Sequence, residues 1–139
     1  MKAKWNYIGN LTLILACTFY TNAFGEITNE DILGEWMAYS ENHMAIGGDI
    51  FVKTTSIDYK KHGEVNFKIL KATDSEYILE LDRDVDAGIY MRIGPIRKSW
   101  SDDYLDLEVA YYETAKKALK ERANRMSNSS SWGIYTKSK

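Results

Sequence analysis

Short segments in which apolar and polar residues alternate recur along this chain, separated by polar turns at intervals near ten residues. In residues 64–71, for example, Val65, Phe67 and Ile69 fall on one face and mostly polar residues fall on the other. A period of two is the signature of a strand with one face in a core and the other in water. The chain also has ten tyrosines, four tryptophans and a single proline, a composition that favours strands. We therefore expect a mainly β protein.

The spacing of these segments predicts an antiparallel meander of seven to eight short strands. Turn signals at this interval are typical of a sandwich or a closed barrel. A barrel is the simpler solution, because closure removes exposed sheet edges without help from disulfides or prolines. Gly94-Pro95 should end one strand, since proline cannot donate to a ladder. The expected strands are residues 36–40, 49–57, 64–71, 77–81, 89–93, 105–109 and 132–136.

Helical patterns flank these strands. Thr28 can cap a short N-terminal helix whose first turn carries Glu30 and Asp31, and Gly34 would end it. Residues 41–48 read as a loop. Near the C-terminus, the steps between apolar residues change to three and four, which predicts one amphipathic helix before the last strand. The apolar stripe of that helix is Tyr112, Ala115, Leu119, Ala123 and Met126.

The segment Leu33-Gly34-Glu35-Trp36 enters the first expected strand. A helical turn, a Gly-x-Trp and then a meander of short strands resemble the lipocalin and lipocalin-like (calycin) families. The polar turn and alternating leucines of residues 101–107 are similar to a late strand of small bacterial lipocalin-like domains. Over residues 28–136, the resemblance implies a barrel whose closed end is plugged by Trp36. The family often places a basic residue from late in the barrel over this tryptophan, and Lys137 is the candidate.

Residues 1–25 have the features of a secretory signal peptide. Lys2 and Lys4 supply a positive end, an apolar stretch follows, and Ala23 and Gly25 are small residues at the expected cleavage site. The apolar stretch is too short and too polar for a transmembrane helix of about 20 residues. We therefore expect residues 1–25 to be a signal peptide and residues 26–139 to be one barrel domain. The protein would be exported, either to a periplasm or as a secreted protein.

Cys17 is the only cysteine of the chain, and it leaves a second possibility open. Residues 14–17 resemble a bacterial lipoprotein signal, in which the cysteine is acylated and anchors the protein to a membrane. Cleavage after Gly25 would instead leave no cysteine, which excludes a disulfide framework, a cysteine zinc site and a thiol nucleophile. A secreted eukaryotic domain of this size more often carries disulfides, so the composition favours a bacterial protein.

The charges divide unevenly along the chain. In residues 26–110, 18 acidic residues outnumber 9 basic ones, whereas in residues 111–139, 7 basic residues outnumber 2 acidic ones. The ordinary interpretation is an acidic domain surface neutralised by a basic helix packed against it. The alternative is a charged face for a protein partner. Nucleic acid is not expected as a partner, because most of the chain is acidic and the N-terminus indicates export.

The sequence offers little material for catalysis or metal binding. His43 and His62 are the only histidines, and both fall in expected loops, where solvated side chains are the rule. Acids alternate in residues 82–88 as in a calcium loop, but the glycine comes one place late and position twelve is Ile93, so an acidic hairpin tip is favoured. No nucleophile has a recognisable base beside it. We expect no enzyme, no catalytic residue, no metal and no cofactor.

Two binding functions remain. The first is an exported carrier that holds a small apolar or amphipathic molecule inside the barrel, although the same side chains could also fill the barrel completely. Its candidate lining residues are Trp36, Phe51, Phe67, Tyr77, Leu79, Met91 and Leu107. The second is a protein-binding module, such as a periplasmic immunity protein or an enzyme inhibitor. Its candidate contact residues are the acidic Asp82, Asp84 and Asp86 and the basic Lys116 and Lys120.

Overall fold

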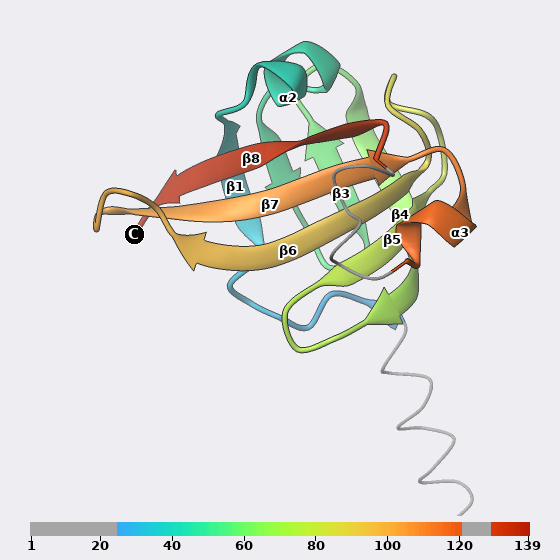
Figure 1. Cartoon of the computed structure of the whole chain (residues 1–139), viewed down its shortest axis with the longest axis horizontal. Coiled ribbons are helices and arrows are strands. Elements are labelled where there is room, and N and C mark those ends of the chain that lie inside the picture. Colours follow the sequence, from blue (N-terminus) through green and yellow to red (C-terminus); the bar gives the residue numbers. More distant parts are fainter. Residues whose placement is uncertain (1–24, 121–128) are drawn as a thin grey trace, which may run out of the picture.

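The computed structural model describes residues 25–120 and 129–139, which form a closed barrel of eight strands (Figure 1). Each strand pairs antiparallel with the next along the chain, and β1 pairs with β8 to close the barrel. The predicted mainly β meander is therefore confirmed. The strands are β1 (Gly34–Ala38), β2 (Ile50–Val52), β3 (Ser56–Tyr59), β4 (Gly63–Ala72), β5 (Tyr77–Leu81), β6 (Tyr90–Lys98), β7 (Tyr104–Tyr112) and β8 (Ser131–Ser138).

Two short helices accompany the strands, α2 (Glu41–Ile46) and α3 (Ala115–Ala118). Residues 29–33 form a hydrogen-bonded turn, in which the Asn29 side chain accepts from the Asp31 amide at 3.0 Å. Helix α2 lies within residues expected to be a loop. Helix α3 lies before the last strand, as predicted, with Thr114 as its N-cap, but Tyr112 of the predicted apolar stripe belongs to β7. Residues 121–126 of the predicted helix, and all of the predicted signal peptide except Gly25, lie outside the described residues.

Two strand predictions were wrong in detail. Residues 49–57 form two strands, because the chain turns back at residues 53–55, where the Lys53 amide donates to the Ser56 carbonyl at 2.9 Å. Gly94-Pro95 does not end a strand but lies inside β6. The register of β6 against β7 shifts between Ile93 and Ile96, so a bulge absorbs the missing donor and the strand continues.

The core lies inside the barrel, where the inward residues of all eight strands meet. The alternation read from the sequence is confirmed in β4 to β7, since the predicted inward residues are mostly buried there. These side chains are Val65, Ile69, Tyr77, Leu79, Leu81, Met91, Ile93, Leu107 and Val109. Burial of this much apolar surface is the main source of stability for a domain of this size.

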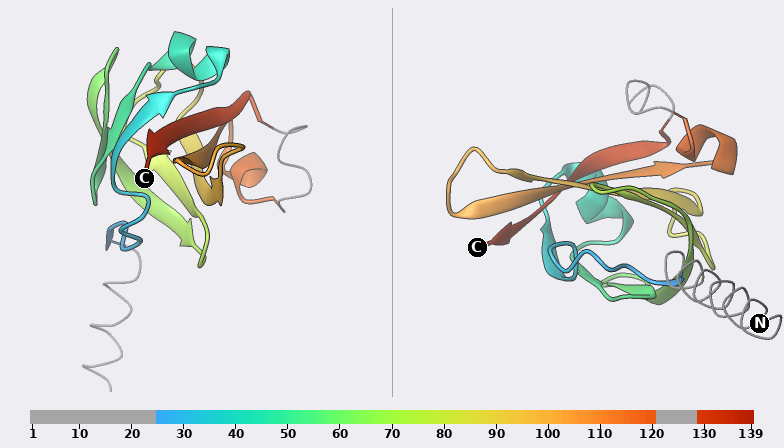
Figure 2. Two further views of the ribbon diagram at one scale, coloured as in Figure 1. Left: turned by 90° about the vertical axis from the view of Figure 1, so that its left-hand side faces the viewer. Right: turned by 90° about the horizontal axis from the view of Figure 1, so that it is seen from below.

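The helices cover different parts of the barrel. Helix α2 packs against β8 and β1 at one end, and α3 packs on the outside of β6 and β7 (Figure 1). Arg92 of β6 points outward, as the alternation predicts, but is buried: its Nε donates to the Ala118 carbonyl at 2.7 Å and its Nη1 lies 3.0 Å from Glu76 Oε1. The far end of the β6–β7 hairpin extends past the body of the barrel, as both Figure 1 and the right-hand view of Figure 2 show.

Candidate functional site

Trp36 closes one end of the barrel. Its side chain is fully buried, and its indole Nε1 donates to the Ile32 carbonyl at 2.8 Å. The ammonium of Lys137 lies over the indole, 4.3 Å from the ring centroid, and donates to the Asp31 carbonyl at 2.9 Å. Partial burial lowers the pKa of Lys137. The placement of a late basic residue over this tryptophan is as the family resemblance implied.

Three tyrosine side chains, Tyr59, Tyr111 and Tyr135, meet in the barrel interior. The hydroxyls of Tyr59 and Tyr111 are 2.8 Å apart, and the Tyr59 hydroxyl lies 3.6 Å from Met91 Sδ. Burial raises the pKa of each of the three phenols above its ordinary value, so they stay neutral. The Tyr59 and Tyr111 hydroxyls are hydrogen-bond partners of each other, as most buried polar groups require.

His43 of α2 lies against this group. Its imidazole is fully buried, stacks on Tyr135 with 4.6 Å between ring centroids, and places Nε2 3.2 Å from the Val109 carbonyl. Burial lowers its pKa. The prediction that His43 is a solvated loop residue was therefore wrong, because residues 41–46 fold as helix α2, which packs against β8 and β1 and buries the ring. Gly133 makes room for the ring, since a Cβ there would come 2.8 Å from His43 Cδ2.

Most of the predicted pocket residues do face the barrel interior. Trp36, Tyr77, Leu79, Met91 and Leu107 are buried there, and Phe67 is partly buried against the same core. The Tyr77 hydroxyl accepts from the backbone amides of residues 28 and 29, so it anchors the N-terminal segment.

Phe51 is the exception among the predicted pocket residues. It points outward from β2 and is 47% exposed. The turn at residues 53–55 places Ile50 and Val52 inward, which leaves the residue between them on the outer face.

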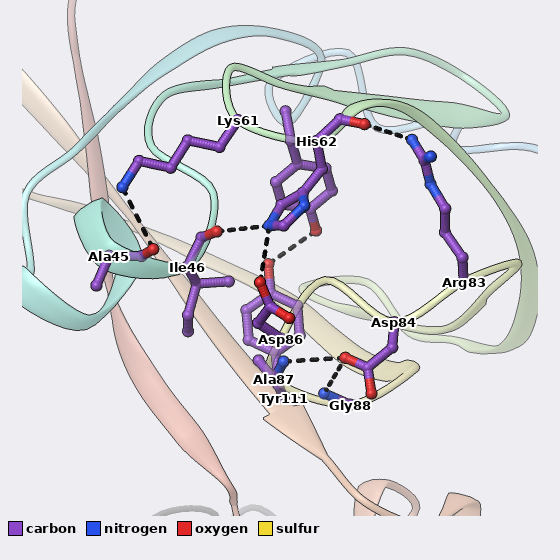
Figure 3. Close-up of polar contacts among 11 residues, drawn as sticks. Ala45, Ile46, Lys61, His62, Arg83, Asp84, Asp86, Ala87, Gly88 and Tyr111 are labelled. Carbon is purple, nitrogen blue, oxygen red and sulfur yellow. Dashed lines mark hydrogen bonds and ion pairs between the residues drawn. The ribbon is translucent and has the colours of Figure 1, made fainter.

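The predicted acidic contact residues lie in the loop between β5 and β6. Figure 3 shows the local polar contacts of Asp84 and Asp86. Asp84 Oδ1 accepts from the amides of Ala87 and Gly88 at 3.1 and 3.0 Å. Asp86, in a left-handed conformation with φ 69°, faces His62, with Oδ2 3.7 Å from Nε2. Asp82 Oδ2 accepts from the Asn66 side chain at 3.3 Å. These contacts fix the shape of the loop.

The predicted basic contact residues lie on or next to α3. Lys116 is inside this helix and Lys120 follows it by two residues. Lys117, between them, forms an ion pair with Glu113, with Nζ 3.2 Å from Oε2. Across residues 25–120 and 129–139, no three His, Cys, Asp or Glu side chains converge as they would around a metal ion.

A surface that the sequence predictions missed lies at the projecting end of the β6–β7 hairpin. Trp100, in the turn between these strands, is 89% exposed, and with Tyr39 and Tyr104 it lines a groove of about 360 Å³. The groove is completed by Ser99, Asp106 and Thr136. A tryptophan in the otherwise polar turn of residues 99–103 is the sequence signal for this surface, because large aromatic residues are seldom placed where nothing packs on them.

A second groove, of about 390 Å³, opens beside β4 and β5. Phe67, Leu81 and Ile89 give it an apolar floor, and polar side chains of residues 66, 68, 80 and 82 surround it. Of the predicted pocket residues, Phe67 lines this groove.

Together these features define a class of protein: an eight-stranded antiparallel meander barrel closed by a tryptophan under a lysine, consistent with a lipocalin-like barrel. Comparison of the chain with protein-family models, with curated proteins and with solved structures gives no significant match. Within the described part of the chain, no helix combines the length and apolar character that crossing a membrane requires.

Proposed function

We propose that this protein is a non-enzymatic binding module that recognises another protein through the outer surface around the β6–β7 hairpin. The observation that carries the proposal is the exposure of Trp100, which is 89% accessible beside the exposed Tyr39 and Tyr104. A group of aromatic side chains exposed to water is energetically unfavourable in a monomer and often marks an interaction site. Trp and Tyr are also among the residues most enriched in the interface positions that contribute most to binding energy.

Side chains that fill part of the barrel interior favour recognition at the outer surface of the barrel. The hydroxyls of Tyr59 and Tyr111 are hydrogen-bonded to each other, and the His43 ring stacks on Tyr135. The chain's own side chains therefore occupy this part of the interior. The barrel then acts as a rigid scaffold that presents the hairpin. An immunity protein or enzyme inhibitor in an exported compartment, reached through the signal of residues 1–25, is the kind of module that this description fits.

Site-specific photo-crosslinking tests the proposal. A benzoylphenylalanine placed at position 100 should crosslink a defined protein from an extract of the source cells. The matched control carries the same group at position 51, because Phe51 is also an exposed aromatic residue but lies on the outer face of β2. The purified captured protein should then bind the unmodified chain and compete with the crosslink. Equal capture from both positions would contradict the proposal.

A second candidate function is a carrier of a small apolar molecule, favoured by the groove floored by Phe67, Leu81 and Ile89. Its volume of about 390 Å³ lies in the range of small-molecule pockets. Titration with dodecanoic acid, followed by amide chemical shifts, tests this function. Saturable shifts at these residues that Ile89→Glu abolishes would support a carrier, and shifts spread evenly over the surface would reject it.

A further inference from the structure

We infer that the groove between Tyr39, Trp100 and Tyr104 binds a cationic side chain, an arginine or a lysine presented by an extended segment of the partner protein. This inference rests on the proposed function, since it specifies the chemistry that the hairpin surface recognises. The partner segment would place one long basic side chain between the aromatic rings, with its charged end toward Asp106.

Aromatic side chains form much of the lining of the groove. Three aromatic residues lie around one space of about 360 Å³. The face of a Trp or Tyr ring attracts a cation through the ring quadrupole, and each such contact contributes about 0.5–2 kcal/mol depending on its exposure to water. Groups of aromatic rings recognise quaternary ammonium groups in many proteins, and Arg and Lys side chains also pack over single aromatic faces.

One carboxylate also lies at the groove. Asp106 of β7 lines the groove and is only partly exposed. Its cross-strand neighbour is Arg97, but that guanidinium lies 3.5 Å from Glu108. Within residues 25–120 and 129–139, no ion pair involves Asp106. A partly desolvated carboxylate beside aromatic rings is complementary to a cationic side chain, which forms the strongest kind of hydrogen bond with it.

The groove lies on the outer surface at the junction of several strands. The groove is lined by residues of β7, β8, the β6–β7 turn and the position after β1, and the β6–β7 hairpin projects past the body of the barrel (Figure 1). Asp102 and Asp103 add two exposed acidic residues to the same hairpin turn as Trp100. Nearby negative charge accelerates the association of a basic segment and makes it sensitive to salt.

The test is a titration of the purified ¹⁵N-labelled protein with Nα-acetyl-arginine methylamide, using the neutral citrulline analogue as the matched probe. The arginine probe should shift the Trp100 indole and the Asp106 and Thr136 amides, and should bind at least about fivefold more tightly than citrulline, which corresponds to roughly 1 kcal/mol. Asp106→Asn should remove most of that preference. Phe51→Ala, an exposed aromatic away from the groove, should leave it unchanged.

The outcomes separate this inference from the proposed function. Equal binding of the arginine and citrulline probes, or binding that Asp106→Asn does not weaken, would overturn the cationic assignment. Shifts caused by the arginine probe at residues outside the groove would also overturn it. Binding of the protein to phosphatidylcholine vesicles, without binding of the arginine probe, would overturn it as well. In each of these cases the crosslinked partner can still depend on Trp100, and the protein-binding function would stand. Loss of the crosslink difference between positions 100 and 51 would instead reject the function itself.

Discussion

Lys137 lies over the indole of Trp36, with 4.3 Å between the ammonium nitrogen and the ring centroid. The same ammonium donates to the carbonyls of Asp31 and Leu33, at 2.9 and 3.3 Å. One residue of the last strand therefore ties the closing tryptophan of the first strand to the turn that precedes it. The contact joins the two ends of the described domain, and it should stabilise the whole barrel.

Lys137→Ala should lower the free energy of unfolding by about 1–2 kcal/mol, because it removes a partly desolvated cation–π contact and two hydrogen bonds. Lys137→Met keeps much of the aliphatic stem over the indole and should recover part of that loss. Denaturant unfolding followed by circular dichroism measures both. Equal stability of the wild type and Lys137→Ala would show that the contact contributes nothing.

His43 should make the stability depend on pH. Burial lowers its pKa in the folded protein below the ordinary value of 6.5, so the unfolded chain takes up a proton first as the pH falls. The stabilisation is complete above pH 6.5 and is lost as the pH falls below 6.5 toward the folded-state pKa, at up to about 1.4 kcal/mol per pH unit. Chemical denaturation at a series of pH values between 7.5 and 5 should show this slope, and His43→Phe should flatten it. An unchanged slope in His43→Phe would assign the pH dependence to other groups.

Gly133 should resist substitution because of the ring that passes over it. An alanine Cβ would come 2.8 Å from both His43 Cδ2 and Ser40 Cβ, so α2 would have to move away from β8. Overpacking of this kind costs about 1–3 kcal/mol. Combining Gly133→Ala with His43→Ala should give a smaller loss than the sum of the two single changes. Strict additivity of the three unfolding free energies would indicate that the two residues do not contact each other.

Substitutions of Arg92 and Glu76 should have strongly non-additive effects on the free energy of unfolding. The pair is almost fully buried between α3 and the barrel, with Nη1 3.0 Å from Oε1. Arg92→Met leaves the Glu76 carboxylate buried beside an apolar group and should cost about 3–5 kcal/mol. Because an apolar pair can replace a buried ion pair, the double variant with Glu76→Met should be more stable than Arg92→Met alone. A double variant less stable than both single variants would contradict this view of the pair.

The fold could be predicted from the sequence because it depends on the alternation of apolar and polar residues and on the spacing of the turns. Val65, Leu79, Met91 and Leu107 were placed inward by their period of two alone, and the family resemblance placed Lys137 over Trp36. Phe51 was misassigned because the turn at residues 53–55 is Lys-Thr-Thr, which lacks the glycine, proline or asparagine that usually marks a turn. If that turn is not recognised, the sequence does not determine which side chains of residues 49–57 point inward and which point outward.

The candidate site was less accessible, for two physical reasons. A six-residue helix such as α2 is too short for a helical period to stand out, so the burial of His43 depends on tertiary packing against β8. The groove at the hairpin joins residues far apart in the chain, with Tyr39 after β1, Trp100 between β6 and β7, and Thr136 in β8. Only the closure of the barrel brings these side chains together.

The dissociation constant of the crosslinked partner, measured by calorimetry for the wild type, Trp100→Ala and Phe51→Ala, tests recognition through the hairpin most directly. Removing a central aromatic of an interface typically costs 2 kcal/mol or more, so Trp100→Ala should weaken binding at least about 30-fold. Phe51→Ala should stay within about twofold of the wild type. Equal affinities for all three proteins, or a larger loss in Phe51→Ala, would contradict a binding surface at the β6–β7 hairpin.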